Sequence, residues 1–430
     1  MRVAVVGAGW AGLAAAVRAT QAGHAVDLFE AAPMPGGRAR SDDDAADASD
    51  NGQHILLGGY ARTLGLMRDV GVDPAEVLQR LPLAMLFPDG SGLALRGTGP
   101  RLLDAARALA TARGFGVRDK LSLLRLAVDW RRREFRCDPA LTVGALLRDI
   151  ATPRVRERLL EPLCVAALNT PVDVASAEVF LAVLRDSLFG NRGASDLLLP
   201  RAPLARLLPQ PAIDWLRARG ASVHLRRRVA ALQRSTDGWL LQGASLEAEP
   251  AGAYDRVVLA TPATEAARLT REIAPAWSAV AGALAHEPIA TLRIRAPARP
   301  WPAPMLALEH DATRRPAQFA FPGSAIEDGM QDAMLVVSAA ADWLENGSEA
   351  LAQAAIAQWR EASGLPAAAS VECLDTRIDR RATFRCIAGV RRPAAAIAPG
   401  LAAAGDYVRG PYPATLESAV RSGETAVEGL

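Results

Sequence analysis

The chain begins with an apolar run, a glycine-rich turn and an alanine-rich helical pattern. Residues Arg2 to Val6 are mostly β-branched, which predicts a buried strand, and the pattern that follows the turn predicts a helix through Gln21. A second apolar run, Ala25 to Phe29, predicts the next strand and is followed by Glu30. A strand, a helix and a strand in this order predict a parallel βαβ unit and therefore an α/β fold.

Later apolar patterns predict a second group of elements and a return to the first. Residues 76–200 show mostly helical periodicity, whereas 280–385 mix strand-like runs, such as Ala333 to Ser338, with a helix at Leu351 to Glu361. Near the C-terminus, Leu401 to Ala404 predicts a buried strand, and a helix is expected from about Thr415. No internal repeat interrupts this order.

The first turn has the spacing of a dinucleotide-binding site, GxGxxG, at Gly7 to Gly12 (GAGWAG). Gly7 permits a tight turn, Gly9 lets a pyrophosphate approach the backbone, and Gly12 lets the helix pack close to the strand. Ala8 lies between the first two glycines and is counted with the binding turn. Glu30, 23 residues after Gly7, can accept hydrogen bonds from a ribose.

Two further segments distinguish FAD from NAD. The segment Pro33 to Arg38 (PMPGGR) resembles the GGR segment of the flavin amine oxidase and phytoene desaturase superfamily, in which Gly37 and Arg38 would contact the cofactor. The C-terminal Gly405-Asp406 pair and the helix after it resemble the superfamily's last flavin-binding element. This resemblance implies that Asp406 binds the ribityl chain and that the backbone at Leu416 and Glu417 points the helix dipole at the flavin ring.

Two internal segments fit the same resemblance. Ala221 to Leu232 predicts a pair of strands, and family members place a backbone contact to adenine at the position of Val229. Tyr254 to Pro262 resembles the strand and crossover that lead out of the FAD domain.

The most specific resemblance is to the hydroxysqualene dehydroxylase family, the squalene-associated FAD enzymes of bacterial hopanoid pathways. It rests on Asp50 to Tyr60 (DNGQHILLGGY), Glu161 to Pro171 (EPLCVAALNTP) and Ser195 to Pro200 (SDLLLP), and it covers nearly the whole chain. The resemblance implies reductive removal of the hydroxyl of hydroxysqualene to give squalene, by loss of the allylic hydroxyl and hydride transfer from reduced flavin.

The resemblance also implies a Rossmann-type, flavin amine oxidase-like FAD-binding domain with an inserted α+β substrate domain. Because the cofactor segments are separated along the chain, we expect a discontinuous FAD-binding domain formed by 1–75, 200–265 and 390–430. The intervening 76–199 and 266–389 would then form the substrate-binding domain.

The reaction needs a proton donor for the leaving oxygen and an apolar cavity that excludes water. His54 is the first candidate donor, because its motif would run along the flavin edge, where Gly52 would also contact the cofactor; a structural histidine or a positioning contact to FAD is the competing interpretation. Asp50 would orient His54, act as the acid itself, or be an ordinary turn carboxylate. Asn169 and Tyr60 are candidate substrate contacts.

Three alternatives remain open. A carotenoid or phytoene-type desaturase shares the fold and a lipophilic substrate, but transfers hydride toward the flavin. An amine or protoporphyrinogen-type oxidase is a second candidate, although Lys120, the only lysine, lies far from the flavin segments. A non-catalytic FAD-bound scaffold for a squalene-synthesising complex is the third.

Composition adds few constraints. The 430 residues carry 49 Lys+Arg and 47 Asp+Glu, so the chain has no global field that would recruit nucleic acid. The four cysteines lie far apart, which favours a reducing, cytoplasmic compartment and predicts no metal site. The longest stretch without Asp, Glu, Lys or Arg has 15 residues, Val3 to Val17, which is shorter than a membrane span requires.

The segment from Arg101 to Arg136 is unusually basic, with ten basic and four acidic side chains on a leucine-rich helical pattern. One interpretation is an interfacial patch that docks on an anionic membrane, at the inner face of the cell membrane, and receives a lipophilic substrate. The other is an amphipathic helix with a solvated basic face. Enzymes of squalene synthesis are further candidate partners.

Overall fold

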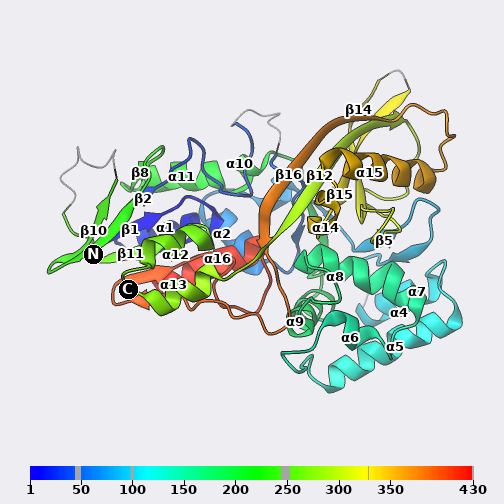
Figure 1. The fold of residues 1–430 in the computed structure, drawn as a ribbon, viewed down its shortest axis with the longest axis horizontal. Helices are drawn as coiled ribbons and strands as arrows, with labels where there is room; N and C mark the ends of the chain where they lie inside the picture. The colour runs from blue at the N-terminus through cyan, green and yellow to red at the C-terminus, as the bar shows by residue number, and fades with distance from the viewer. Residues whose placement is uncertain (44–49, 98–100, 244–251, 328, 429–430) are drawn as a thin grey trace. The chain divides into compact units, whose positions relative to one another are not determined.

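A computed structural model describes residues 1–43, 50–97, 101–243, 252–327 and 329–428. The chain forms two compact units (Figure 1). Unit 1 comprises Met1–Arg80, Leu197–Leu284 and Arg391–Leu430, and unit 2 comprises Leu81–Asp196 and Ala285–Val390. Each unit is therefore assembled from segments that lie far apart in the sequence.

The centre of unit 1 is a twisted sheet in which five of six strands are parallel. Its β1 begins the chain and pairs with β2 on one side and β11 on the other. The strands, in their order across the sheet, are β17 (Ala396–Ala398), β18 (Leu401–Ala403), β11 (Arg256–Leu259), β1 (Arg2–Val6), β2 (Ala25–Phe29) and β8 (Ser222–His224). The βαβ unit predicted at the N-terminus is confirmed.

The sheet of unit 1 is covered on both faces, which explains the continuous apolar character of β1. Val3 and Val5 enter one core cluster, while Ala4 and Val6 enter another on the opposite face. The helices of unit 1 are α1 (Trp10–Gln21), α2 (Ala61–Asp69), α3 (Pro74–Val77), α10 (Leu204–Leu207), α11 (Pro209–Arg217), α12 (Ala263–Thr270), α13 (Pro275–Gly282) and α16 (Leu416–Val427).

Helices α1 and α16 lie side by side although they occur at opposite ends of the chain (Figure 1). Gly423 permits this approach, because a Cβ atom there would lie 2.1 Å from the Ala11 carbonyl oxygen. The C-terminal helix is thereby fixed against the helix that begins at the glycine-rich turn.

Two small sheets complete unit 1. One pairs β9 (Ala231–Ser235) with β10 (Gly238–Gln242), and the other has the order β3 (Leu56–Leu57), β7 (Leu197–Pro200), β4 (Leu78–Leu81). The prediction of paired strands within Ala221 to Leu232 is therefore wrong in one respect: β8 joins the large sheet and β9 pairs with β10 instead.

Unit 2 contains a long, mostly antiparallel sheet with α15 (Ser348–Ser363) against it (Figure 1). Leu351, Ala355 and Trp359 of α15 join the sheet's core cluster. The strands, in their order across the sheet, are β16 (Glu372–Phe384), β12 (His286–Pro297), β15 (Met330–Val337), β14 (Phe319–Glu327), β13 (Leu306–Ala307), β5 (Ala84–Leu86) and β6 (Gly92–Ala94).

The remaining part of unit 2 is helical, as the periodicity of 76–200 predicts. Its helices are α4 (Arg101–Thr111), α5 (Val117–Arg132), α6 (Val143–Leu147), α7 (Pro153–Val155), a π-helical turn (Arg156–Leu160), α8 (Glu161–Leu168) and α9 (Ala177–Leu188), with α14 (Ala341–Leu344) beside α15. None of the helices within the described ranges has the length and apolarity to cross a membrane.

The boundaries of the compact units differ most from the expected domains at residues 266–284. These were expected in the substrate domain, but α12 and α13 belong to unit 1. The reason is that Leu269 packs into the cluster formed by Val257 and Leu401 of the large sheet. The assignment of unit 1 to cofactor and unit 2 to substrate stays a prediction.

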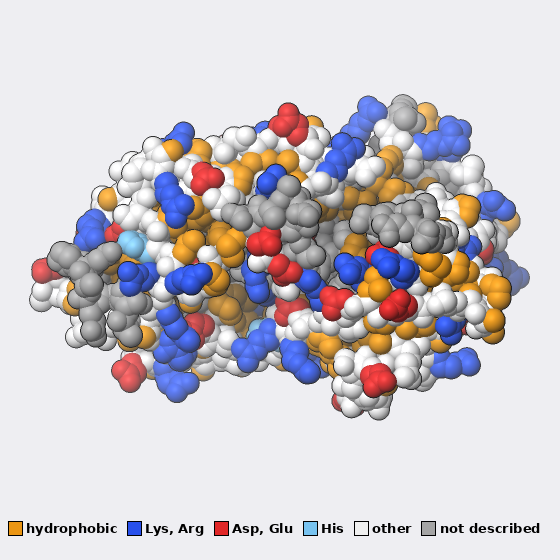
Figure 2. Space-filling view, turned by 90° about the horizontal axis from the view of Figure 1, so that it is seen from above, with side chains coloured by type: hydrophobic (Ala, Val, Ile, Leu, Met, Phe, Trp, Pro, Cys, Tyr) orange, Lys and Arg blue, Asp and Glu red, His pale blue; other side chains and the backbone are white. Residues whose placement is uncertain are grey.

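On the face shown in Figure 2, basic and acidic side chains are interspersed.

Candidate functional site

The glycine-rich turn between β1 and α1 uses its three glycines in two different ways. At Gly7 and Gly12 a Cβ atom would lie 2.5 Å from the Ala260 oxygen and 1.8 Å from the Gly7 oxygen, so packing of the protein itself requires glycine there. At Gly9 the nearest atom to such a Cβ is the Gly37 Cα, at 3.8 Å. That is an ordinary contact distance, so packing of the protein does not require glycine at Gly9, which lies at the N-terminus of α1, where the first amides have no intrahelical acceptor.

Glu30 closes one side of this turn. One oxygen of its carboxylate accepts a hydrogen bond from the Ala8 amide at 2.7 Å, and the other accepts from the Ala32 amide at 2.8 Å. A carboxylate has about four acceptor positions, so these two bonds fix its orientation and still leave capacity for ribose hydroxyls. Glu30, which the sequence spacing predicts to bind a ribose, therefore lies against the glycine-rich turn.

The second glycine pair lies directly on the first turn. The Gly36 amide donates to the Ala8 carbonyl at 2.8 Å, and Gly37 faces Gly9 so closely that a Cβ on Gly37 would lie 3.2 Å from the Gly9 Cα. The Trp10 indole nitrogen, within the first motif, donates to the Ala39 carbonyl at 3.0 Å. Two motifs separated along the sequence therefore form one surface.

Arg38 extends this surface to the C-terminal part of the chain. Its guanidinium forms an ion pair with the buried Asp406 carboxylate, at 2.6 Å. The tertiary structure thus brings together Arg38 and Asp406, the two residues for which the sequence predicts flavin contacts from opposite ends of the chain. Next to them, Tyr407 is buried, and its hydroxyl has no hydrogen-bond partner among the described residues.

The loop that carries Asp406 is held by Arg392, which the sequence analysis missed. This buried guanidinium donates to five carbonyl oxygens of the loop, those of Asp406, Tyr407, Val408, Gly410 and Tyr412. The nearest acidic residues along the chain, Asp379 and Asp406, are more than ten positions away, and an arginine beside a proline, as in Arg392-Pro393, carries no signal for this role. Arg392 is a positioning residue, because it acts on the cofactor segment through the loop backbone.

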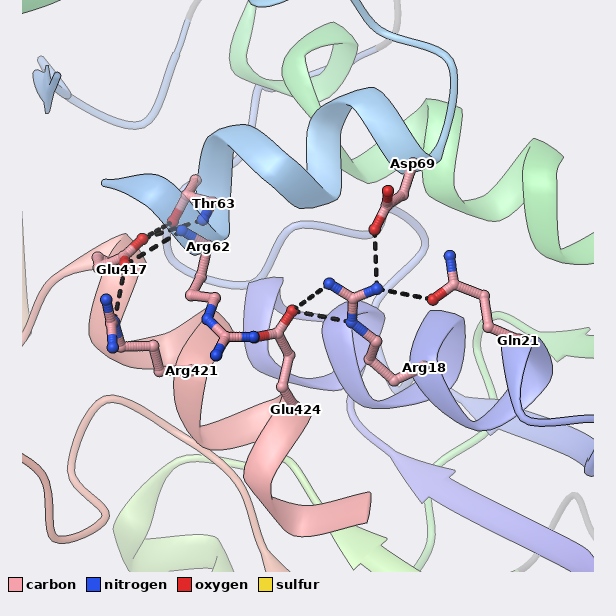
Figure 3. Close-up of polar contacts among 8 residues, drawn as sticks. All are labelled: Arg18, Gln21, Arg62, Thr63, Asp69, Glu417, Arg421 and Glu424. Carbon is pink, nitrogen blue, oxygen red and sulfur yellow. Dashed lines mark hydrogen bonds and ion pairs between the residues drawn. The ribbon is translucent and has the colours of Figure 1, made fainter. Parts of the chain in front are cut away.

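The N-terminus of α16 carries Leu416 and Glu417, the predicted flavin-facing positions. Thr415 caps the helix by accepting from the Ser418 amide at 3.1 Å. The Glu417 side chain is buried and accepts from the amide and hydroxyl of Thr63, both at 2.9 Å, at the start of α2 (Figure 3). Only the backbone of Glu417 is therefore available for the predicted contact.

A second buried carboxylate joins α16 to the other helices. Glu424 contacts Arg18 of α1 at 2.6 Å and Arg62 of α2 at 3.3 Å, and Arg18 also contacts Asp69 at 2.8 Å (Figure 3). Opposite charges compensate one another throughout this network, as burial of charge requires. The ion pairs fix α16 in register with α1, the helix of the glycine-rich turn.

Asp50 and His54, the two candidate acids, each hydrogen-bond to another part of the chain, and the orientation of His54 by Asp50 stays a prediction. Asp50 Oδ1 accepts from the Ser41 hydroxyl at 2.7 Å and from the Leu204 amide at 2.9 Å, which caps α10. His54 Nδ1 lies 3.1 Å from the Gly52 carbonyl. Because a carbonyl can only accept, Nδ1 carries a proton, and an acid role for His54 would use the other ring nitrogen, Nε2.

Two other predicted residues are placed within the core of unit 1. Burial raises the pKa of Tyr60, whose hydroxyl hydrogen-bonds to Thr415 beside Glu417. Val229 is buried in the cluster on one face of the large sheet. Tyr60 therefore braces the start of α16, and the predicted adenine contact at Val229 would come from its backbone.

Asn169 of unit 2 has a structural role that leaves no donor for a substrate. It ends α8 in the left-handed conformation, with φ of 45°. Its amide nitrogen donates to the Glu287 carbonyl at 3.1 Å and the Thr383 hydroxyl at 2.9 Å, and its oxygen accepts from the Ala339 amide at 2.7 Å. Both amide hydrogens are thus used within the protein, and the predicted substrate contact, which would use the remaining acceptor position of the oxygen, stays a prediction.

Comparison with known proteins identifies the family to which the chain belongs. The family described as flavin containing amine oxidoreductase matches residues 10–430. The chain belongs to this family. It is therefore an FAD-dependent oxidoreductase. FAD fits the residues present: a glycine at Gly9 that packing does not require, the helix N-terminus beside it, and a Tyr407 hydroxyl next to Asp406 that has no partner among the described residues.

Relatives of this flavin oxidoreductase include hydroxysqualene dehydroxylase of Zymomonas mobilis, 29% identical over 99% of this chain and 97% of the relative. A probable zeta-carotene desaturase of Synechococcus elongatus is also 29% identical, over 54% of this chain and 51% of the relative. An oxidoreductase of Methanosarcina mazei, 16% identical and covering both chains fully, has the same fold with a TM-score of 0.74.

Proposed function

We propose that this flavin oxidoreductase removes the hydroxyl group of hydroxysqualene reductively and so forms squalene. The observation that carries the proposal is the similarity to a hydroxysqualene dehydroxylase over 99% of this chain and 97% of that relative. Similarity to the zeta-carotene desaturase covers only about half of each chain. A lipophilic isoprenoid is the substrate class in either case.

Different residues of unit 1 would bind different parts of the cofactor. The turn at Gly9, with Glu30 and Arg38, would hold the pyrophosphate and ribose, and Asp406 would hold the ribityl chain. The amides at the start of α16 would face the flavin ring and stabilise negative charge on it. Reduced flavin, when bound, supplies the hydride for the carbon from which the hydroxyl departs.

The leaving oxygen must receive a proton, because hydroxide is a poor leaving group. In the proposed reaction the allylic C–O bond breaks, the oxygen leaves as water with the added proton, and a C–H bond forms with the hydride. The Nδ1–H of His54 is directed to the Gly52 carbonyl, so the proton would come from Nε2 of the doubly protonated ring. The Gly52 carbonyl stabilises that cation and fixes the orientation of the ring.

An anaerobic single turnover tests this function. Chemically reduced holoenzyme is mixed with hydroxysqualene while the oxidised flavin absorbance and the lipid products are followed. We expect reoxidation of the flavin together with squalene. A flavin that stays reduced with hydroxysqualene, and an oxidised enzyme that is bleached by a polyene precursor, would instead establish a desaturase. A flavin inert to both substrates would indicate the scaffold.

A lipophilic substrate also suggests the partners of the protein. We propose contact with a membrane surface as the route by which the isoprenoid reaches the enzyme, and enzymes of squalene synthesis as candidate suppliers. The basic helical segment of unit 2 supports the membrane contact.

A further inference from the structure

Helix α5 of unit 2 has an apolar side chain row that nothing in unit 2 covers. Val117, Leu121, Leu124 and Val128, here called the apolar stripe, have relative exposures of 75%, 47%, 53% and 41%. Their spacing of four, three and four residues places them in one line along a helix of 3.6 residues per turn. Within the described ranges, Met1 and Leu103 are the only other large hydrophobic residues that are at least as exposed as Val128, so the stripe is a concentrated feature.

The opposite side of α5 already packs on the protein. Ser122, Leu126 and Trp130 are buried, and the Ser122 hydroxyl donates to the Ile150 carbonyl at 2.9 Å. An amphipathic helix needs only one apolar face to pack against a core. The apolar stripe is therefore a second apolar face, and the helix is apolar on two opposite sides.

A row of arginines runs beside the apolar stripe. Arg118, Arg125 and Arg132, here called the arginine row, are all exposed and follow one another every seven residues. On a helical projection this row lies roughly 70° from the stripe. The two acidic residues of α5 have partners outside the arginine row: Asp119 accepts from Gly116 and Thr152, and Asp129 pairs with Arg133.

We propose that this face of α5 docks on an anionic lipid surface, with the apolar stripe inserted among the lipids and the arginine row on their headgroups. An apolar row flanked by basic residues is the pattern of helices that lie in the membrane interface. A second copy of the chain fits the face less well, because a twofold contact would bring two arginine rows together. The docking stands on the geometry of α5 and does not depend on the identity of the substrate.

Vesicle sedimentation with the full-length holoprotein tests the proposal. We expect binding to vesicles of phosphatidylcholine with phosphatidylglycerol, weaker binding to phosphatidylcholine alone, and loss of the difference at high salt. The double variant Leu121→Asp/Leu124→Asp should lower partitioning about tenfold or more. Arg118→Gln, Arg125→Gln and Arg132→Gln should each lower binding to the anionic vesicles by about fivefold.

The matched control is Val174→Asp/Ile387→Asp. It adds the same two negative charges to unit 2 at two other exposed apolar residues, 38% and 39% exposed, and it should bind like the unchanged protein. Circular dichroism and flavin content establish that each variant is folded. The proposal is overturned if the unchanged protein binds neither kind of vesicle, or if the α5 double variant binds as well as the control.

A second copy of the chain, as the alternative partner of the apolar stripe, would give a different result. If light scattering shows a dimer that Leu121→Asp/Leu124→Asp converts to a monomer and the control does not, the stripe is an interface between two copies and the lipid proposal fails. If the α5 double variant has altered turnover but binds vesicles like the unchanged protein, α5 affects the proposed reaction and does not dock on lipid. That result would contradict the docking proposal.

Discussion

The surroundings of Gly9 in unit 1 and of Asn169 in unit 2 differ in what they require of the residue. At Gly9 a Cβ atom would lie 3.8 Å from the Gly37 Cα, an ordinary contact, so the packing of the protein does not require glycine there. At Asn169 each amide hydrogen and the carbonyl oxygen has a protein partner. Polar groups are paired inside proteins wherever they can be, so the satisfied amide of Asn169 indicates a structural link. A glycine that packing does not require instead fits the close approach of a ligand to the backbone.

A similar difference separates Tyr407, beside Arg38 and Asp406, from Thr170. Arg38 reaches a buried carboxylate next to a tyrosine hydroxyl that has no partner within the described residues. The Thr170 hydroxyl both donates to the Leu168 carbonyl and accepts from the Cys386 amide. Substitutions in the first region should therefore affect cofactor and turnover, and substitutions in the second should affect stability.

The largest effect is expected for Gly9→Val. The side chain would fill the space left for the pyrophosphate, so FAD retention should fall to background, as measured by absorbance after desalting. The apoprotein should stay folded, because the backbone at Gly9 has φ of −72°, which any residue adopts, and a Cβ there meets no atom closer than 3.8 Å. A fully flavinated variant would mean that the turn does not bind the cofactor.

Replacement of His54 by alanine should lower turnover about 100- to 10,000-fold while FAD is retained. The reason is the loss of the proposed proton donor to the leaving oxygen. His24→Ala, which removes a histidine elsewhere in unit 1, is the control and should retain activity. Turnover of the His54 variant equal to that of the control would exclude His54 as the acid and leave it a structural residue.

For Asn169→Ala we expect a loss of stability on the order of 3 kcal/mol, because three buried groups lose their partner and alanine is strained at positive φ. Urea unfolding measures the loss. Asn169→Gly removes the same side chain without the backbone strain, and so separates the two causes. If the folded variants have normal stability but no turnover, Asn169 contacts the substrate after all.

The smallest effect is expected for Glu287. Burial raises the pKa of its carboxyl group above the ordinary value of 4.5, while the Ala341 amide and Arg385 act in the opposite direction. A raised pKa means that the folded protein binds this proton more tightly than the unfolded chain. The stability contribution is therefore present at low pH and is lost as pH rises through the raised value.

Glu287→Gln should remove that dependence. The difference in unfolding free energy between the variant and the unchanged protein, measured from about pH 5 to about pH 8, should move in favour of the variant as pH rises. A difference that is constant with pH would show that Glu287 has the same pKa in both states.

Local patterns were sufficient for the elements of the cofactor region. The strand Arg2–Val6, the helix Trp10–Gln21 and the strand Ala25–Phe29 lie where periodicity and glycine spacing predict them. Less was predictable around Ala221 to Leu232, because strand partners are chosen by segments far away in the sequence. The same limit applied to α12 and α13, whose packing on the sheet of unit 1 is decided by Leu269.

The candidate site shows the same limit. Residues with a motif, such as Gly9, Glu30 and Asp406, were found from the sequence, and their binding roles stay predictions. Arg392 was missed, because five carbonyl acceptors leave no pattern of residue types along the chain. Asn169 lies in a motif shared with the family, yet its hydrogen bonds are used within unit 2.

The sequence by itself determined the βαβ start, the FAD-binding motifs and the family, because these depend on residues that are close along the chain or on fixed spacings. The tertiary structure alone decided that Arg38 meets Asp406, that Asn169 is a structural link, and that the apolar stripe of α5 faces outward. Periodicity shows that a helix has apolar faces, but burial of one of them depends on which distant segments pack against it.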